Sequence, residues 1–180
     1  TFGLAAISLT LAPKYYGPGY GPVGQAMMIE SIIILMIAWS NAIGVQYLLP
    51  LNKNKEFTIS VTLGAIVNIV LNFPFIELWG LNGAMVATVA SEVSVTLYQL
   101  WVIRKIVNYK LLFWGTWKYL VSSILMFIVV FAMNRFVSNT WLMLLLEVSV
   151  GGIIYIGMAY LLKASVIDEI KDILVKRFKK

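Results

Sequence analysis

The sequence predicts an all-α, polytopic membrane protein, and three observations lead to that prediction. Of 180 residues, 61% are hydrophobic and 12% are charged, and the mean hydropathy is +0.88. An average soluble domain has roughly 45–50% apolar and about 25% charged residues. The charged residues are also clustered, which leaves apolar runs near the roughly 20 residues that one helical crossing needs. This composition excludes a soluble domain, a disordered chain and a nucleic-acid-binding protein.

Five full membrane spans are expected, each bounded by charges, Pro or Gly. In chain order they cover about residues 23–49, 57–73, 83–103, 117–136 and 141–162. Pro22 and Pro50 flank the first span, and Pro74 is expected to close the second. Residues 1–12 are apolar but too short to cross a bilayer. We interpret them as the end of a clipped helix, and the chain as a C-terminal fragment.

The basic residues predict how the spans are oriented. Twelve of the 14 Lys and Arg residues fall on one side of the predicted membrane, in the loops 50–56 and 104–118 and after residue 162. The other side holds only Lys14 and Arg135. Because cytoplasmic loops carry the excess of Lys and Arg, the richer side and the C-terminus are expected to be cytoplasmic.

The chain is expected to divide into a membrane bundle, residues 1–163, and a cytoplasmic tail, residues 164–180. Apolar residues recur in the tail at helical spacing, with acidic and basic residues between them: Ile167, Ile170, Ile173, Leu174 and Phe178. Such an amphipathic helix with a basic end would lie in the interface against anionic lipid. It would serve as a membrane anchor or, alternatively, as a regulatory or partner-binding segment.

A polar stripe is predicted in the third span. Glu92 lies midway along it, and Thr88, Thr96 and Gln99 lie on nearly the same helical face. An ionisable group inside the membrane is costly, so the stripe should face the interior of a bundle. Glu92 is therefore a candidate contact for a proton, a cation or a substrate. The alternative is a hydrogen-bonded packing residue.

Further polar groups lie in other spans. Asn68 and Asn72 are one helical turn apart in the second span, where paired amides most often hold neighbouring helices together. Glu30 and Asn41, eleven residues apart in the first span, share a helical face and are further candidates for substrate contact or coupling. Glu147 lies in the fifth span. A packing role is favoured for both Glu30 and Glu147.

Catalytic and metal chemistry is not predicted. The chain has no His and no Cys, which excludes thiol chemistry, a Ser-His-Asp triad and the usual zinc ligand sets. We therefore expect no catalytic residues, no metal and no cofactor, and we expect that the protein is not an enzyme.

Several short motifs follow one another along the first three spans: Tyr15-Tyr16-Gly17-Pro18-Gly19-Tyr20, Gln46-Tyr47-Leu48-Leu49-Pro50-Leu51-Asn52-Lys53-Asn54-Lys55-Glu56, Asn68 with Asn72, Gly80, Gly83-Ala84, Ala87-Thr88 and Glu92. Their order resembles the C-terminal part of a bacterial polysaccharide repeat-unit (O-antigen or capsule-type) flippase. That family belongs to the multidrug/oligosaccharidyl-lipid/polysaccharide exporter superfamily. Asn52 departs from the pattern, because Gly is common there. The resemblance covers residues 13–104.

The resemblance implies a fold and a function. The chain would supply helices nine (clipped) to fourteen, most of one lobe of a V-shaped, two-lobed fold like that of multidrug and toxic-compound exporters. It would move oligosaccharide units linked to undecaprenyl diphosphate to the outer leaflet by alternating access. Lipid-linked oligosaccharide, membrane lipid and polysaccharide polymerase machinery would be its partners in the bacterial cell membrane. Glu92, Asn68 and Asn72 would line the cavity or couple transport.

Two other functions are compatible with the sequence. One is a multidrug antiporter or lipid II flippase of the same superfamily. The other is a membrane enzyme or scaffold of envelope assembly without transport activity. An enzyme would need His, Asp or Arg side chains that converge near one interface, and this chain carries few charges inside its spans.

Overall fold

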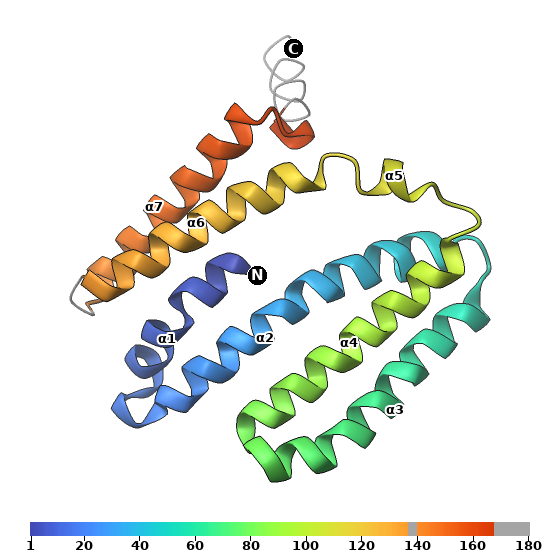
Figure 1. Cartoon of the computed structure of the whole chain (residues 1–180), viewed down its shortest axis with the longest axis horizontal. Helices are drawn as coiled ribbons and strands as arrows, with labels where there is room; N and C mark the ends of the chain where they lie inside the picture. Colours follow the sequence, from blue (N-terminus) through green and yellow to red (C-terminus); the bar gives the residue numbers. More distant parts are fainter. Residues whose placement is uncertain (137–139, 168–180) are drawn as a thin grey trace. The chain divides into compact units, whose positions relative to one another are not determined.

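The computed structural model describes residues 1–136 and 140–167, and this part of the chain is helical and contains no strand. Its elements are α1 (Phe2–Tyr16), the 3₁₀-helix η1 (Pro18–Tyr20), α2 (Gly21–Ser40), the π-helix η2 (Asn41–Leu48), α3 (Asn54–Trp79), α4 (Leu81–Ile103), α5 (Tyr109–Leu112), α6 (Thr116–Phe136) and α7 (Trp141–Leu161) (Figure 1).

Five helical stretches within the described residues are long and apolar enough to cross a membrane. They are Pro18–Leu48, Asn54–Trp79, Leu81–Ile103, Tyr109–Asn134 and Trp141–Leu161. This finding confirms the predicted all-α polytopic class. The chain divides into two compact units, one formed by Gly3–Asn108 and the other beginning at Tyr109. We call them the α1–α4 unit and the α6–α7 unit, and we describe each by itself.

Helix α4 is the centre of the α1–α4 unit, because it packs against both α2 and α3. Figure 1 shows α3 and α4 side by side as an antiparallel pair, joined by the tight turn at Gly80, where φ is +57°. Small residues allow the close approach. A Cβ at Gly83 would overlap the backbone carbonyl of Phe75 on α3, and a Cβ at Gly64 would collide with the Val95 side chain on α4.

The prediction that Pro74 closes the second span is wrong. Helix α3 continues through Pro74 and ends at Trp79. Proline removes one backbone N–H donor, but a helix in apolar surroundings still satisfies the rest of its backbone best by continuing. The N-terminal helix α1 likewise continues past the predicted end of its apolar run, through Pro13 to Tyr16.

The end of the first span contains a feature that was not predicted. Residues Asn41–Leu48 form a π-helix, in which the Leu49 N–H donates to the Gly44 carbonyl, five residues back, at 3.1 Å. Within this π-helix, Gly44 packs tightly against Gln99 and Phe57. A Cβ there would lie 2.7 Å from Nε2 of Gln99 and 2.8 Å from the Phe57 ring.

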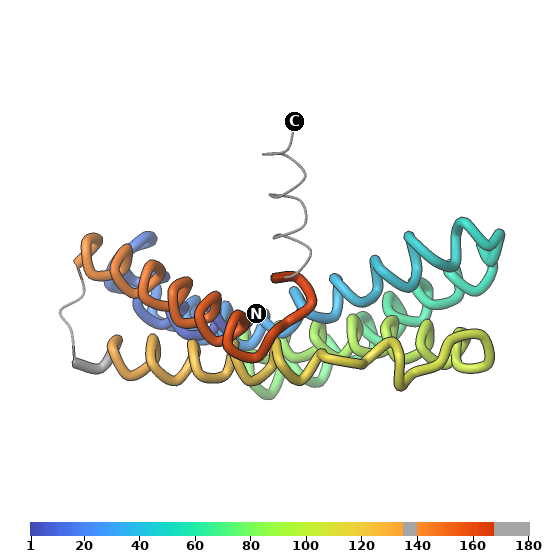
Figure 2. Tube along the Cα trace, turned by 90° about the horizontal axis from the view of Figure 1, so that it is seen from above, coloured from blue at the N-terminus to red at the C-terminus, as the bar shows by residue number. Residues whose placement is uncertain are grey.

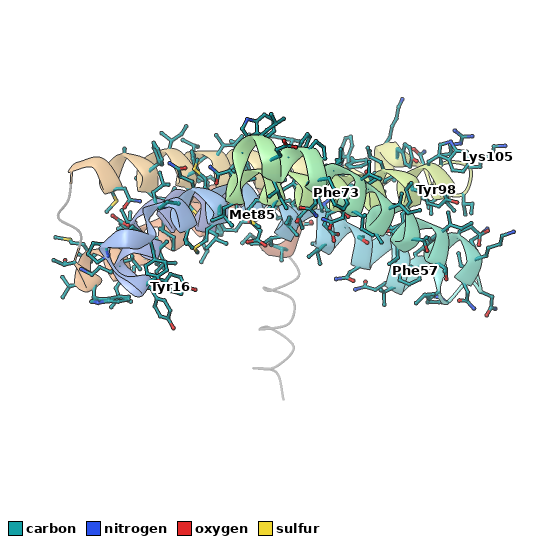
Figure 3. The ribbon with its side chains drawn as sticks, turned by 90° about the horizontal axis from the view of Figure 1, so that it is seen from below. Tyr16, Phe57, Phe73, Met85, Tyr98 and Lys105 are labelled. Carbon is teal, nitrogen blue, oxygen red and sulfur yellow. The ribbon has the colours of Figure 1, made fainter. Side chains whose placement is uncertain are left out.

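Apolar side chains pack together at the end of the α1–α4 unit where the π-helix lies. Ile43, Leu48 and Ile103 form its buried cluster. Figure 3 shows Phe57, Tyr98 and Lys105 toward this end, and Tyr16 and Met85 toward the other. The alternating helices thus bring the basic loop 50–56 and the residues after α4 to one end, as the predicted topology requires.

Helices α6 and α7 form the second unit, and they lie side by side in Figures 1 and 2. A Cβ at Gly151 of α7 would lie 3.0 Å from the Val130 side chain of α6. Helix α7 begins with a cap, because the Thr140 hydroxyl accepts the Met143 N–H at 3.4 Å. Most of the predicted amphipathic tail, residues 168–180, lies outside the described residues.

Candidate functional site

The predicted polar stripe of α4 faces the interior of the α1–α4 unit. Thr96 and Gln99 are buried, and Thr88 and Glu92 are half-buried. Thr96 donates from its hydroxyl to the Met36 carbonyl of α2 at 3.2 Å. The stripe therefore connects α4 to a neighbouring helix, as its periodicity predicted.

The same helix face also connects α4 to α3. The Gln99 Nε2 donates to the Ser60 hydroxyl at 3.0 Å, and the Ser91 hydroxyl donates to the Gly64 carbonyl at 2.7 Å. All three side chains are buried. Oε1 of Gln99 is buried and has no hydrogen-bond donor among the described residues. Such interhelical bonds contribute about 0.6 kcal/mol each on average inside a membrane.

Glu92 differs from the other members of the stripe. Its neighbours one turn away on each side, Thr88 and Thr96, both hydrogen-bond to another residue. The Glu92 carboxylate makes no hydrogen bond or ion pair with any described residue. Since it is only half-buried and makes none of these bonds, the Glu92 carboxylate could contact a cation, a proton or a polar substrate.

Asn68 and Asn72 lie together, as the sequence predicted. Nδ2 of Asn72 donates to Oδ1 of Asn68 at 2.9 Å, and Nδ2 of Asn68 donates to the Thr88 hydroxyl at 3.4 Å. The Thr88 hydroxyl donates to the Ala84 carbonyl at 3.0 Å. This chain of hydrogen bonds joins α3 to α4 one helical turn from Glu92.

Glu30 and Asn41 are both exposed, and no hydrogen bond among the described residues joins either of them to Glu92. Glu30 lines a cavity of about 280 Å³ whose other walls are apolar: Leu4, Met27, Ile33, Ile34 and Ile37. Asn41 begins the π-helix. Asn68 and Asn72 thus belong to a hydrogen-bonded group one helical turn from Glu92, whereas Glu30 and Asn41 lie apart from it on the first span.

Sequence reasoning missed several residues of this site. Ser60 and Gly64 accept the hydrogen bonds from α4, and Gly44 packs against Gln99. A serine and a glycine on one face of the second span could have indicated contact with another helix. Asn82 also donates to Oε1 of Gln25 at 3.3 Å, which joins α4 to α2 near their first turns.

The chemistry of the site is that of amides, hydroxyls and one carboxylate. Among the described residues, no three His, Cys, Asp or Glu side chains gather as a metal site. The site could bind a monovalent cation or a proton at Glu92, and it could donate or accept hydrogen bonds to sugar hydroxyls. The described part of the stripe has no Lys or Arg with which to bind a diphosphate.

The chain is similar to three curated membrane proteins. It is 34% identical over 96 residues to a protein of Escherichia coli (strain K12) provisionally named an O-antigen transporter, a match covering 53% of this chain and 22% of that protein. It is 29% identical over 122 residues to the lipid II flippase of Bacillus subtilis (strain 168), covering 61% and 22%. It is 25% identical over 169 residues to an uncharacterized membrane protein of Methanocaldococcus jannaschii, covering 92% and 32%.

These similarities support a relationship at low identity. The chain spans between about a fifth and a third of the length of the relatives it matches. No protein-family model and no solved structure matches it. Together with the five apolar helices, the similarities identify a multi-pass membrane protein that resembles transporters of the flippase type.

Proposed function

We propose that this chain is part of a flippase that moves lipid-linked oligosaccharide repeat units across the bacterial cell membrane. The observation that carries the proposal is the similarity to the O-antigen transporter of E. coli, which extends over half of the chain. In this proposal residues 1–163 form part of one lobe, and the basic loops and the tail 164–180 face the cytoplasm. The protein is a transporter and performs no enzymatic step.

In the proposed mechanism, the α1–α4 unit acts as a rigid part of one lobe of an alternating-access transporter. The interhelical hydrogen bonds along α4 hold α2, α3 and α4 in fixed register while the lobes rock. Glu92 then presents a carboxylate at a constant position. It would contact the coupling ion or the sugar hydroxyls of the substrate, and Asn68 and Asn72 would position α3 beside it.

The contacts of Glu92 support a coupling or substrate role. A carboxylate that served only to pack α4 would be expected to accept hydrogen bonds from the adjoining helices, as buried polar groups generally do. Glu92 accepts none from the described residues, whereas Thr96 and Gln99, further along the same face, are both bonded. Glu30 and Asn41 are less strongly supported, because both are exposed on the first span.

Deletion of the full-length gene tests the function. We expect lipid-linked oligosaccharide to accumulate and surface polysaccharide to disappear. Complementation with Glu92→Gln should lower surface polysaccharide at least 10-fold, whereas Glu56→Gln should restore it. Glu56 is a matched control, because its carboxylate pairs with Lys53 at 3.6 Å outside the apolar part of α3. Normal polysaccharide without an accumulated intermediate would overturn the proposal.

A lipid II flippase is the second candidate, and the similarity to the B. subtilis protein favours it. The same deletion distinguishes the two substrates. Accumulated lipid II with arrested cell-wall synthesis would identify the second candidate, whereas accumulated repeat units with a normal cell wall would support the first. Unchanged lipid intermediates together with new sensitivity to organic cations would instead identify a multidrug antiporter.

Orientation in the membrane is tested by single-cysteine labelling. The chain contains no Cys, so each introduced thiol reports one position. We expect Lys110→Cys to react with an impermeant maleimide only after the cells are opened, and Lys14→Cys to react in intact cells. The opposite pattern would reverse the proposed orientation.

A further inference from the structure

A third carboxylate lies inside the predicted membrane spans, and its surroundings differ from those of Glu30 and Glu92. Glu147 is in α7, and only 4% of its side chain is exposed. Glu30 is exposed, and Glu92 is half-buried. Glu147 lies six residues after the start of α7, about 9 Å along the helix axis at 1.5 Å per residue. It is therefore well inside the span and away from its end.

One turn beyond Glu147, the same face of α7 packs against apolar side chains of α6. Gly151, one turn further on, is buried, and a Cβ there would lie 3.0 Å from Val130 and 3.4 Å from Met126 of α6. Glu147 makes no hydrogen bond and no ion pair with any described residue. The sequence pattern favoured a packing role for this residue, yet the carboxyl group lacks the hydrogen bonds that such a role would supply.

The other titratable groups of the two helices determine whether a counter-charge is available. Lys118 is engaged, since its Nζ donates to the Lys163 carbonyl at 2.7 Å. Arg135 lies in the last turn of α6. The tyrosines and the other lysine lie toward the opposite end of the pair: Tyr119, Tyr155, Tyr160 and Lys163.

An ionised carboxylate in such a place would be very unfavourable. Burial without a partner disfavours the charged form of an acid, and the usual outcome is that the acid takes up a proton. We infer that Glu147 is a proton-binding site within the α6–α7 unit. The ligand is the proton itself, and Glu147 belongs to a different unit from the polar stripe of α4.

This inference has a consequence for the transport cycle, and that step rests on the proposed function. A neutral carboxyl group can stay packed between helices, whereas a carboxylate must reach water or a cation. Loss of the proton would therefore favour conformations that hydrate Glu147. By linkage, conformations that expose Glu147 to water would release its proton, so proton binding and helix movement would depend on each other.

The test uses the full-length protein in lipid nanodiscs and dicyclohexylcarbodiimide, a hydrophobic reagent that requires a protonated carboxyl group. The acid O–H adds across one C=N bond, and acyl migration to nitrogen leaves a stable N-acylurea with no leaving group. Peptide mass spectrometry then quantifies each site. At pH 7 we expect Glu147 to be labelled at least 10-fold more than Glu56, and we expect its labelling to fall as the pH is raised. Equal or lower labelling of Glu147 would overturn the inference.

Infrared spectroscopy supplies a second measurement that needs no reagent access. The variant Glu147→Gln keeps the shape and neutrality of the protonated acid, so it should fold. Its difference spectrum at pH 7 should show loss of a protonated-carboxyl C=O band. A difference spectrum that shows loss of an ionised carboxylate band instead would contradict the inference.

The variant Arg135→Gln distinguishes the proton from a buried ion pair. If Glu147 carries a proton, its labelling is already high and should stay unchanged within twofold. If it is instead ionised and paired with Arg135, labelling should be low in the natural protein and rise in the variant. These measurements involve no transport, so a negative result leaves the proposed flippase function standing, and failure of that function leaves the proton site standing.

Discussion

The two units hold their helices together in different ways. In the α1–α4 unit, polar side chains of α4 bond to α2 and α3 along its length: Asn82, Ser91, Thr96 and Gln99. In the α6–α7 unit, Lys118 and Tyr119 at the start of α6 make polar contacts with the residues after α7. Further along, apolar side chains and Gly151 make the contact.

The difference concerns how strongly the helices of each unit are held together. Inside a membrane, apolar packing between helices competes with equally apolar lipid, so hydrogen bonds and close backbone contact decide whether helices stay together. The α1–α4 unit has both along its length. In the α6–α7 unit, the contact at Gly151 is with the apolar side chains of Val130 and Met126, which suits a pair of helices that separate when Glu147 loses its proton.

The largest expected effect comes from the closest backbone contact. Gly83→Ala places a methyl group against the Phe75 carbonyl, and neither backbone can move away cheaply. We expect a loss of about 3 kcal/mol in the free energy of unfolding, or failure to fold. Gly151→Ala, in the other unit, places a methyl group 3.0 Å from a Val130 methyl, which has to shift by only a few tenths of an ångström, and should cost less than about 1 kcal/mol.

Thermal unfolding in nanodiscs measures both variants, with Gly157→Ala as control. A Cβ at Gly157 meets nothing within 4 Å, so this change should be neutral or slightly stabilising. Equal stability of the Gly83 and Gly151 variants would show that the two units do not differ in rigidity.

A smaller effect is expected at the buried amide. Gln99→Met keeps the volume but removes the bond from Nε2 to Ser60, and it should cost about 1 kcal/mol. Part of the loss is offset, because Oε1 of Gln99 is buried without a donor and its removal relieves that cost. A double-mutant cycle with Ser60→Ala should give a coupling of about 0.6 kcal/mol. Strictly additive effects would mean that the bond contributes nothing.

The spans and the stripe could be predicted from the sequence because they depend on patterns within one helix. Hydropathy placed all five spans, and helical spacing placed Thr96 and Gln99 on a buried face. Pro74 misled the prediction, because proline's effect on a helix depends on whether lost hydrogen bonds can be replaced by water. That information is not in the local sequence.

Other features depend on contacts between helices. The π-helix at Asn41–Leu48 accompanies the close packing of Gly44 on Phe57 and Gln99, which are far away in the sequence. Two acceptors for α4 are backbone carbonyls, those of Met36 and Gly64. Every residue has such a carbonyl, so nothing in the sequence identifies the carbonyl of Met36 as an acceptor, and Gly64 is indicated only by its small size. The helical faces could be predicted from the sequence, whereas the hydrogen-bond partners on neighbouring helices could not.

A still smaller effect should separate two serines of the same helix. The Ser91 hydroxyl bonds to α3, whereas the Ser94 hydroxyl bonds to the Ala90 carbonyl of its own helix at 2.7 Å. Ser91→Ala should cost about 0.6 kcal/mol, and Ser94→Ala should be close to neutral. Chemical unfolding in mixed micelles has the sensitivity for this comparison. If both serines cost the same, the interhelical bond is not what stabilises the α1–α4 unit.

The smallest expected effect is at the contact between Lys118 of α6 and the Lys163 carbonyl. Lys118→Met removes an ammonium group from the Lys163 carbonyl, just after the C-terminus of α7, where a positive charge also favours the helix dipole. We expect a loss of about 0.3–1 kcal/mol, felt only locally. Hydrogen exchange should quicken at the amides of Leu162 and Ala164, which bond back into the last turn of α7, and stay unchanged in α3 and α4. Lys55→Met is the matched control, since the Lys55 ammonium makes no contact of this kind among the described residues. Faster exchange throughout α7 would instead show that the Lys118 contact stabilises the whole of α7.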